Sequence, residues 1–138
     1  MRLATAVLSL LFVMNAGISL AVDASICNPG SDISYHPRGQ LKSCLLKDMY
    51  LINGVKCNLM AHIDLYEPGM LKSCVSSDFF NYDGIRCNEY SEVAFYPSGR
   101  LESCKLASRV QIEDTVCAEL EVISLFENGR LKSCGTPR

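Results

Sequence analysis

Eight cysteines in a chain of 138 residues carry the clearest chemical potential of this sequence. Thiols can pair as disulfides, bind zinc or attack a substrate. Zinc modules place ligands about two to four residues apart, and redox enzymes use a CxxC pair or a lone reactive thiol. The spacing here alternates between 17 and 13 residues, which predicts a disulfide framework without metal or cofactor. The cysteines are Cys27, Cys44, Cys57, Cys74, Cys87, Cys104, Cys117 and Cys134.

The cysteines belong to an internal repeat with a period of 30. Stacking the chain on that period aligns a glycine, a leucine and a serine in every copy without insertion or deletion. This pattern predicts one domain, residues 25–138, made of repeats 27–56, 57–86, 87–116 and 117–134. The aligned glycines are Gly39, Gly69, Gly99 and Gly129.

Dipeptides that favour tight turns recur every 15 residues along the repeats. Asn-Gly and Asp-Gly between alternating segments favour two-residue β-hairpins, because both central positions need a positive φ. We therefore expect an antiparallel β-meander, with a looser or longer connection at Glu113-Asp114, which lacks glycine. The dipeptides are Arg38-Gly39, Asn53-Gly54, Pro68-Gly69, Asp83-Gly84, Ser98-Gly99, Glu113-Asp114 and Asn128-Gly129.

The segments between turns have 13 residues, which is long for one flat strand. Their centres carry proline, glycine or small polar residues, as in 28–32 and 76–78, and such residues interrupt a β-ladder. We expect each segment to bend there. The predicted fold is all-β, an antiparallel meander of four 30-residue hairpin repeats folded into two facing layers and stapled by disulfides.

Alternation places every cysteine on the apolar, inward face. Across a two-residue turn Cys57 lies opposite Tyr50, and Cys44 is six residues further back, about 20 Å along a flat strand and beyond disulfide reach. The bend brings Cys44 near both Cys27 and Cys57, so two repeating schemes are open. Joining Cys27 to Cys44 and its translations uses every cysteine, whereas the shifted scheme leaves Cys27 and Cys134 alone. We favour the first scheme for its completeness.

Residues 1–24 have the layout of a secretory signal peptide: a positive charge at Arg2, an apolar run, and small residues at the candidate cleavage sites, Ala21 and Ala24. An uncleaved anchor is the alternative, since the apolar run extends to about 20 residues. Ile26 disfavours lipid attachment at Cys27. Because disulfides persist in oxidising compartments, we expect a secreted or periplasmic protein without a membrane span after cleavage.

Other side chains provide few chemical groups. With 13 Lys and Arg against 15 Asp and Glu, no basic field exists for nucleic acid. His36 and His62 have no fixed partner in the pattern, so we expect no catalytic residue. The carboxylates Glu89, Glu92, Glu119 and Glu121 are expected at bends or at solvent-facing positions, and the sequence indicates no pair of them that would act as acid and base.

One row of residues is a candidate partner-binding stripe. In each repeat an aromatic residue or histidine precedes the turn, and a leucine follows it on the strand directly opposite. Their parity is opposite to that of the cysteines, which predicts an outer face. The row either binds a partner or forms cross-strand pairs that stabilise the hairpins. It consists of His36, Tyr66, Tyr96, Phe126, Leu41, Leu71, Leu101 and Leu131.

The segments ISLFENGRLKS, IDLYEPGMLKS and VAFYPSGRLES resemble the MORN-type repeat, especially the variant in bacterial antitoxin-like repeat proteins. The matching residues include Tyr66, Tyr96 and Phe126, with the glycine and leucine that follow each of them. The resemblance covers about a third of each repeat and implies a β-hairpin array that contacts protein or membrane. The period of 30, the two cysteines per repeat and the predicted export depart from that family.

These features together predict a non-enzymatic, exported protein-interaction module whose partner is another protein or an envelope component. A structural component of the envelope or surface is the alternative. A small hydrolase that uses carboxylates at the bends is a third hypothesis. The oligomeric state stays open.

Overall fold

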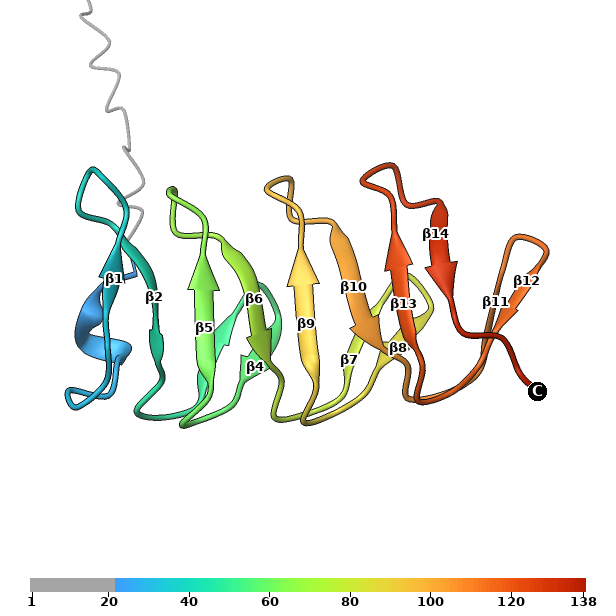
Figure 1. Cartoon of the computed structure of the whole chain (residues 1–138), viewed down its shortest axis with the longest axis horizontal. Helices are drawn as coiled ribbons and strands as arrows, with labels where there is room; N and C mark the ends of the chain where they lie inside the picture. The colour runs from blue at the N-terminus through green and yellow to red at the C-terminus, as the bar shows by residue number, and fades with distance from the viewer. Residues whose placement is uncertain (1–21) are drawn as a thin grey trace, which may run out of the picture.

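The computed structural model describes residues 22–138, so most of the predicted signal peptide lies outside the described residues. Within them, the chain forms short strands that reverse direction at each turn and bend (Figure 1). Eight strands make one continuous antiparallel sheet in the order β1-β2-β5-β6-β9-β10-β13-β14. They are β1 (Ser34–Tyr35), β2 (Leu41–Leu45), β5 (His62–Leu65), β6 (Leu71–Val75), β9 (Glu92–Phe95), β10 (Leu101–Lys105), β13 (Val122–Leu125) and β14 (Leu131–Cys134).

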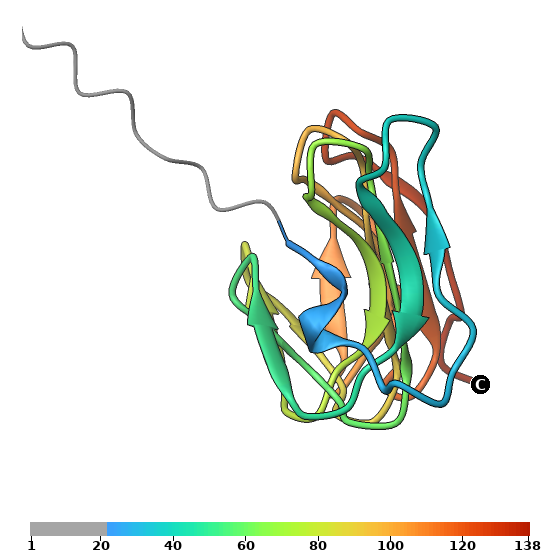
Figure 2. The ribbon, with the colours of Figure 1, turned by 90° about the vertical axis from the view of Figure 1, so that its left-hand side faces the viewer.

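The second layer consists of three separate two-stranded hairpins that face this sheet (Figure 2). The two layers converge at the bends and separate toward the hairpin tips. The predicted all-β fold in two layers is thus confirmed, although the second layer is not a continuous sheet. Its strands are β3 (Tyr50–Ile52), β4 (Val55–Cys57), β7 (Phe80–Tyr82), β8 (Ile85–Cys87), β11 (Val110–Ile112) and β12 (Thr115–Cys117).

The hairpins of the second layer have the predicted two-residue turns. Ile52 faces Val55 across the first of them, and both Asn53 (φ 51°) and Gly54 (φ 77°) are left-handed. The hairpin at Glu113 has the same register, so the expectation of a longer connection there is wrong. Glu113 itself takes the left-handed conformation, with φ 53°.

The turns of the large sheet are one residue longer than predicted. In the second repeat the Gly69 N–H donates to the Tyr66 carbonyl and the Tyr66 N–H donates to the Met70 carbonyl, each at 2.8 Å. Only Gly69 is left-handed in this three-residue loop, which is typical of a type I turn followed by a glycine bulge. Leu71 therefore pairs with Leu65 and not with Tyr66.

A β-bulge then restores the alternation of the strand. Asp64 pairs with Ser73 while Leu65 pairs with Leu71, so Lys72 is the extra residue of β6. Both Leu71 and Cys74 consequently face inward, although three positions separate them. The same shift occurs in the hairpins of the other repeats.

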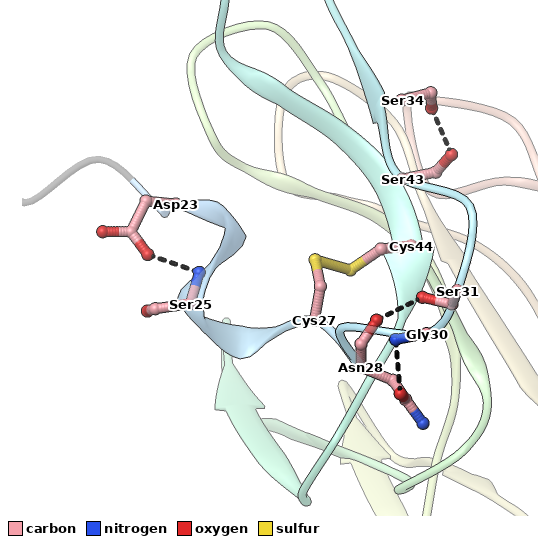
Figure 3. Close-up of a disulfide and its surroundings, with 9 residues drawn as sticks. All are labelled: Asp23, Ser25, Cys27, Asn28, Gly30, Ser31, Ser34, Ser43 and Cys44. Carbon is pink, nitrogen blue, oxygen red and sulfur yellow. Dashed lines mark hydrogen bonds between the residues drawn. A yellow bond between two sulfur atoms is a disulfide. The ribbon is translucent and has the colours of Figure 1, made fainter.

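The four disulfides follow the predicted scheme. Each joins the hairpin layer or the N-terminal segment to the large sheet, and the Cα atoms of Cys57 and Cys74 lie 5.7 Å apart. Figure 3 shows the first disulfide beside a bend that Asn28 stabilises by accepting a hydrogen bond from the Gly30 N–H at 3.0 Å. The pairs are Cys27–Cys44, Cys57–Cys74, Cys87–Cys104 and Cys117–Cys134.

The two ends of the array differ from its middle. At the N-terminal end a single 3₁₀ turn, η1 (Ala24–Ile26), begins at Asp23, whose carboxylate accepts from the Ser25 N–H at 2.8 Å. At the C-terminal end, Pro137 stands where Ser77 and Ala107 donate their N–H groups to the preceding repeat. Because proline has no N–H, this ladder of hydrogen bonds ends there.

Candidate interaction surface

Three of the four leucines of the predicted stripe are core residues, so the prediction that these leucines form an outer surface is wrong. Leu41, Leu71 and Leu101 are at most 2% exposed, and only Leu131, on the last strand, is partly exposed. The three-residue loop and the bulge explain the difference, because together they turn each leucine to the inner face. Leu41, Leu71 and Leu101 are therefore not available to a partner.

The other half of the stripe links neighbouring repeats. The Tyr66 hydroxyl donates to the Phe95 carbonyl at 2.8 Å, and the Tyr96 hydroxyl donates to the Leu125 carbonyl at 2.7 Å. His36 does the same through Nε2, which lies 2.9 Å from the Leu65 carbonyl oxygen. We call these three residues the inter-repeat ladder. Phe126, which has no hydroxyl, occupies the equivalent position in the last of the four repeats.

The environment of the ladder tyrosines favours their neutral form. Partial burial, and then the charges of Glu102 and Glu127, raise the pKa of the Tyr66 and Tyr96 phenols. A neutral phenol keeps the proton that it donates to the next repeat. The ladder therefore stabilises the array, which is the structural interpretation of this row.

A different set of apolar residues is exposed in register along the array. Met60, Tyr90 and Leu120 lie at the bends, at the same position of successive repeats, and are 56%, 68% and 58% exposed. We call them the bend ridge. Because each repeat contributes two strands to the large sheet, the ridge residues are spaced about 10 Å apart, twice the distance between neighbouring strands.

The backbone of the ridge residues adopts a conformation that disfavours large side chains. Met60, Tyr90 and Leu120 have φ values of 56°, 51° and 63°, in the left-handed region. That region costs a residue with a side chain about 1–2 kcal/mol. It persists here because each N–H is bonded to the preceding segment, as the Tyr90 N–H is to the Ser76 carbonyl at 2.8 Å. Gly30 has the equivalent position in the first repeat, but its φ is not positive, so the first bend has a different backbone conformation.

Such strained residues cluster at functional positions, because the surrounding structure must maintain them. The sequence patterns did not single out the bend ridge. Gly30, at the equivalent position of the first repeat, gives no signal either, because its φ is not positive.

Glutamates flank the C-terminal half of the bend ridge. Glu89 precedes Tyr90, and Glu119 and Glu121 enclose Leu120. Within residues 22–138, none of these three carboxylates forms an ion pair. The surface therefore combines apolar side chains with unpaired negative charge.

The remaining predicted chemical groups lie apart from one another. His62 is exposed on β5, and Glu92 is exposed at the start of β9. In the part of the chain that the structure describes, no three His, Cys, Asp or Glu side chains form a group that could hold a metal ion. Residues 22–138 also contain no helix of the length and hydrophobicity needed to cross a bilayer.

No family model matches this chain, and neither a curated protein nor a solved structure matches it. The resemblance to MORN-type repeats stays a prediction.

Proposed function

We propose that this protein is an exported, non-enzymatic protein-interaction module that binds its partner through the bend ridge. One observation carries the proposal: three large apolar side chains are exposed in register on backbone that would favour glycine. A residue that lowers stability without packing into the core is retained most simply because it contacts something outside the chain.

The geometry and charge of the ridge indicate the chemistry of the partner. Apolar residues about 10 Å apart match positions i and i+7 of a helix, which rises about 1.5 Å per residue. The unpaired Glu89, Glu119 and Glu121 favour lysine or arginine beside those apolar residues. We therefore infer a basic, amphipathic segment of another protein as the partner.

The four disulfides indicate an oxidising compartment. We infer export by the predicted signal peptide and cleavage after Ala21. Val22 and Ala24 pack against the core, and Asp23 starts the 3₁₀ turn at the N-terminal end. Cleavage after Ala24 would remove all three residues. Mass spectrometry of the mature protein distinguishes a start at Val22 from a start at Ser25.

The binding proposal is tested with a random peptide library selected on the immobilised, oxidised domain. We expect enrichment of peptides with apolar residues next to lysine or arginine. The affinity of a selected peptide is then measured by fluorescence polarisation for the native domain and for the ridge variant Met60→Asn, Tyr90→Asn, Leu120→Asn. We expect at least tenfold weaker binding to this variant and weaker binding at high salt.

A matched control changes exposed apolar residues elsewhere. Met49 and Leu51 are 50% and 70% exposed on the hairpin layer, and neither is left-handed. Met49→Asn with Leu51→Asn should leave peptide affinity unchanged. Equal affinities for native domain and ridge variant would refute the ridge as the binding surface. Failure to enrich any peptide would instead favour a structural component of the envelope, the alternative proposal.

A further inference from the structure

A cavity of about 320 Å³ lies between the two layers, near the hairpin tips and away from the bend ridge. Its wall includes the Tyr82 ring and the aliphatic residues Ile85, Leu101, Ile112 and Leu125, and its charged lining consists of Asp83 and Arg100. The volume is at the lower end of the range of about 300–1,000 Å³ that is typical of small-molecule sites.

Two residues that line the cavity, Ile112 and Leu125, are smaller than Tyr82 and Phe95, their equivalents one repeat earlier. Between the second and third repeats, the Phe80 ring packs edge-on against Phe95 at 5.7 Å and lies 6.4 Å from the Tyr82 ring. One repeat later smaller residues occupy the three equivalent positions. Val110 replaces Phe80, Leu125 replaces Phe95 and Ile112 replaces Tyr82.

The surroundings of the hairpin-tip glycines show the same difference in packing. A Cβ built on Gly54 would lie 3.7 Å from the Phe80 ring, whereas a Cβ on the equivalent Gly84 would meet nothing within 4 Å. The space that an aromatic ring fills at one junction is therefore open at the next.

Opposite charges stand on the two sides of the cavity mouth without pairing. In the last repeat, Arg130 Nε on the large sheet lies 3.2 Å from Glu113 Oε1 on the hairpin layer, and this ion pair joins the two layers. The equivalent residues one repeat earlier are Arg100 and Asp83, which form no ion pair within the described residues. Arg100 donates instead to the Glu127 carbonyl at 3.1 Å.

The side chain of Asp83 is one methylene shorter than that of Glu113, which is consistent with the open pair. A cation on the sheet side and an anion on the hairpin side thus line the polar part of the cavity. A ligand that matches both charges must carry a carboxylate toward Arg100 and an ammonium group toward Asp83.

We propose that this cavity binds a small zwitterion with an apolar body, such as a large apolar amino acid. The carboxylate pairs with Arg100, the ammonium group pairs with Asp83, and the side chain occupies the space beside Ile112 and Leu125. The site uses none of the bend ridge residues, so it stands or falls independently of the proposed protein interaction.

The probes are L-phenylalanine, phenylacetate, which lacks the amine, and phenethylamine, which lacks the carboxylate. Each is titrated into the oxidised domain by isothermal calorimetry, with NMR shift mapping. L-Phenylalanine should bind saturably, at least tenfold more tightly than either singly charged probe, and shift Leu125 and Ile112 signals. Absence of saturable binding, or equal binding of all three probes, would overturn the proposal.

Variants locate the site. Leu125→Phe introduces the ring that the preceding repeat carries at this position, so we expect a folded domain with the cavity filled and L-phenylalanine binding at least tenfold weaker. Asp83→Asn should have an equal effect by removing one charge. Glu113→Gln, which removes the neighbouring charge that is already paired, should leave binding unchanged. Full binding by both Leu125→Phe and Asp83→Asn would also overturn the proposal.

Discussion

Replacing Tyr90 by asparagine should make the domain more stable while it removes a proposed contact residue. Tyr90 has φ 51° and is 68% exposed, so it maintains a strained backbone while most of its ring contacts solvent. Asparagine enters the left-handed region more readily, because its short polar side chain can bond locally.

The magnitude follows from two opposing contributions. The left-handed conformation costs a residue with a side chain about 1–2 kcal/mol, and asparagine removes part of this cost. Loss of the remaining ring contacts offsets about 0.5–1 kcal/mol, because about a third of Tyr90 is not exposed and unfolded chains also bury part of their apolar surface. We therefore expect the free energy of unfolding to rise by no more than about 0.5 kcal/mol.

Urea denaturation of the oxidised protein measures this change as a higher midpoint at constant slope. The matched variant is Leu51→Asn, because Leu51 is 70% exposed and lies within strand β3. Asparagine is disfavoured in strands, so this control should lose a few tenths of a kcal/mol. A Tyr90→Asn variant that is less stable than the native protein would refute the claim that the ridge is strained.

Three further predictions concern the core, the disulfides and the inter-repeat ladder. Leu101→Ala should lower the free energy of unfolding by about 2–5 kcal/mol, because this leucine is buried. A loss below about 1 kcal/mol in urea denaturation would contradict the burial of Leu101. Changing both Cys57 and Cys74 to alanine should lower the free energy of unfolding by about 3 kcal/mol, because it removes a disulfide between residues 17 apart in the sequence. An unchanged urea denaturation midpoint would contradict this expectation. Raised pKa values mean that Tyr66 and Tyr96 stabilise the fold below the ordinary tyrosine pKa and lose that contribution as pH rises through their folded pKa. Stability should therefore fall above about pH 10, and Tyr96→Phe should show a smaller fall; identical alkaline profiles would count against the ladder.

The disulfides and the two-layer fold could be predicted from sequence because they depend on counting. A fixed repeat period, two regularly spaced turns per repeat and inward-facing cysteines restrict the chain to few arrangements. The two-residue turns of the hairpin layer were predictable for the same reason, since Asn53-Gly54 and Asp83-Gly84 are the residues that such turns require.

The surface was harder to predict, because one extra residue in a turn reverses the direction of the side chains that follow. Both turn types contain glycine, so the dipeptide at Asn128-Gly129 does not separate them. Pro68 was the available signal: its ring fixes φ at a negative value, whereas the first position of the predicted turn needs a positive one. That incompatibility identifies the longer loop and with it the burial of Leu71.

The cavity depends on differences between copies rather than on what the copies share. Leu125 and Ile112 differ from Phe95 and Tyr82, the equivalent residues one repeat earlier. A search for common features passes over such positions. The effect of such a difference depends on the arrangement of the two layers, which decides whether the changed side chain lies in solvent or leaves a cavity in the core.

The local pairing of the disulfides has a consequence for how the array can change over evolution. Every cysteine finds its partner 17 residues away, inside its own repeat. Duplication or deletion of one whole repeat therefore adds or removes a complete pair and leaves no thiol without a partner. The length of such a protein can vary in whole units, and each new unit can diverge at its bend or its inner wall while its neighbours keep their existing contacts.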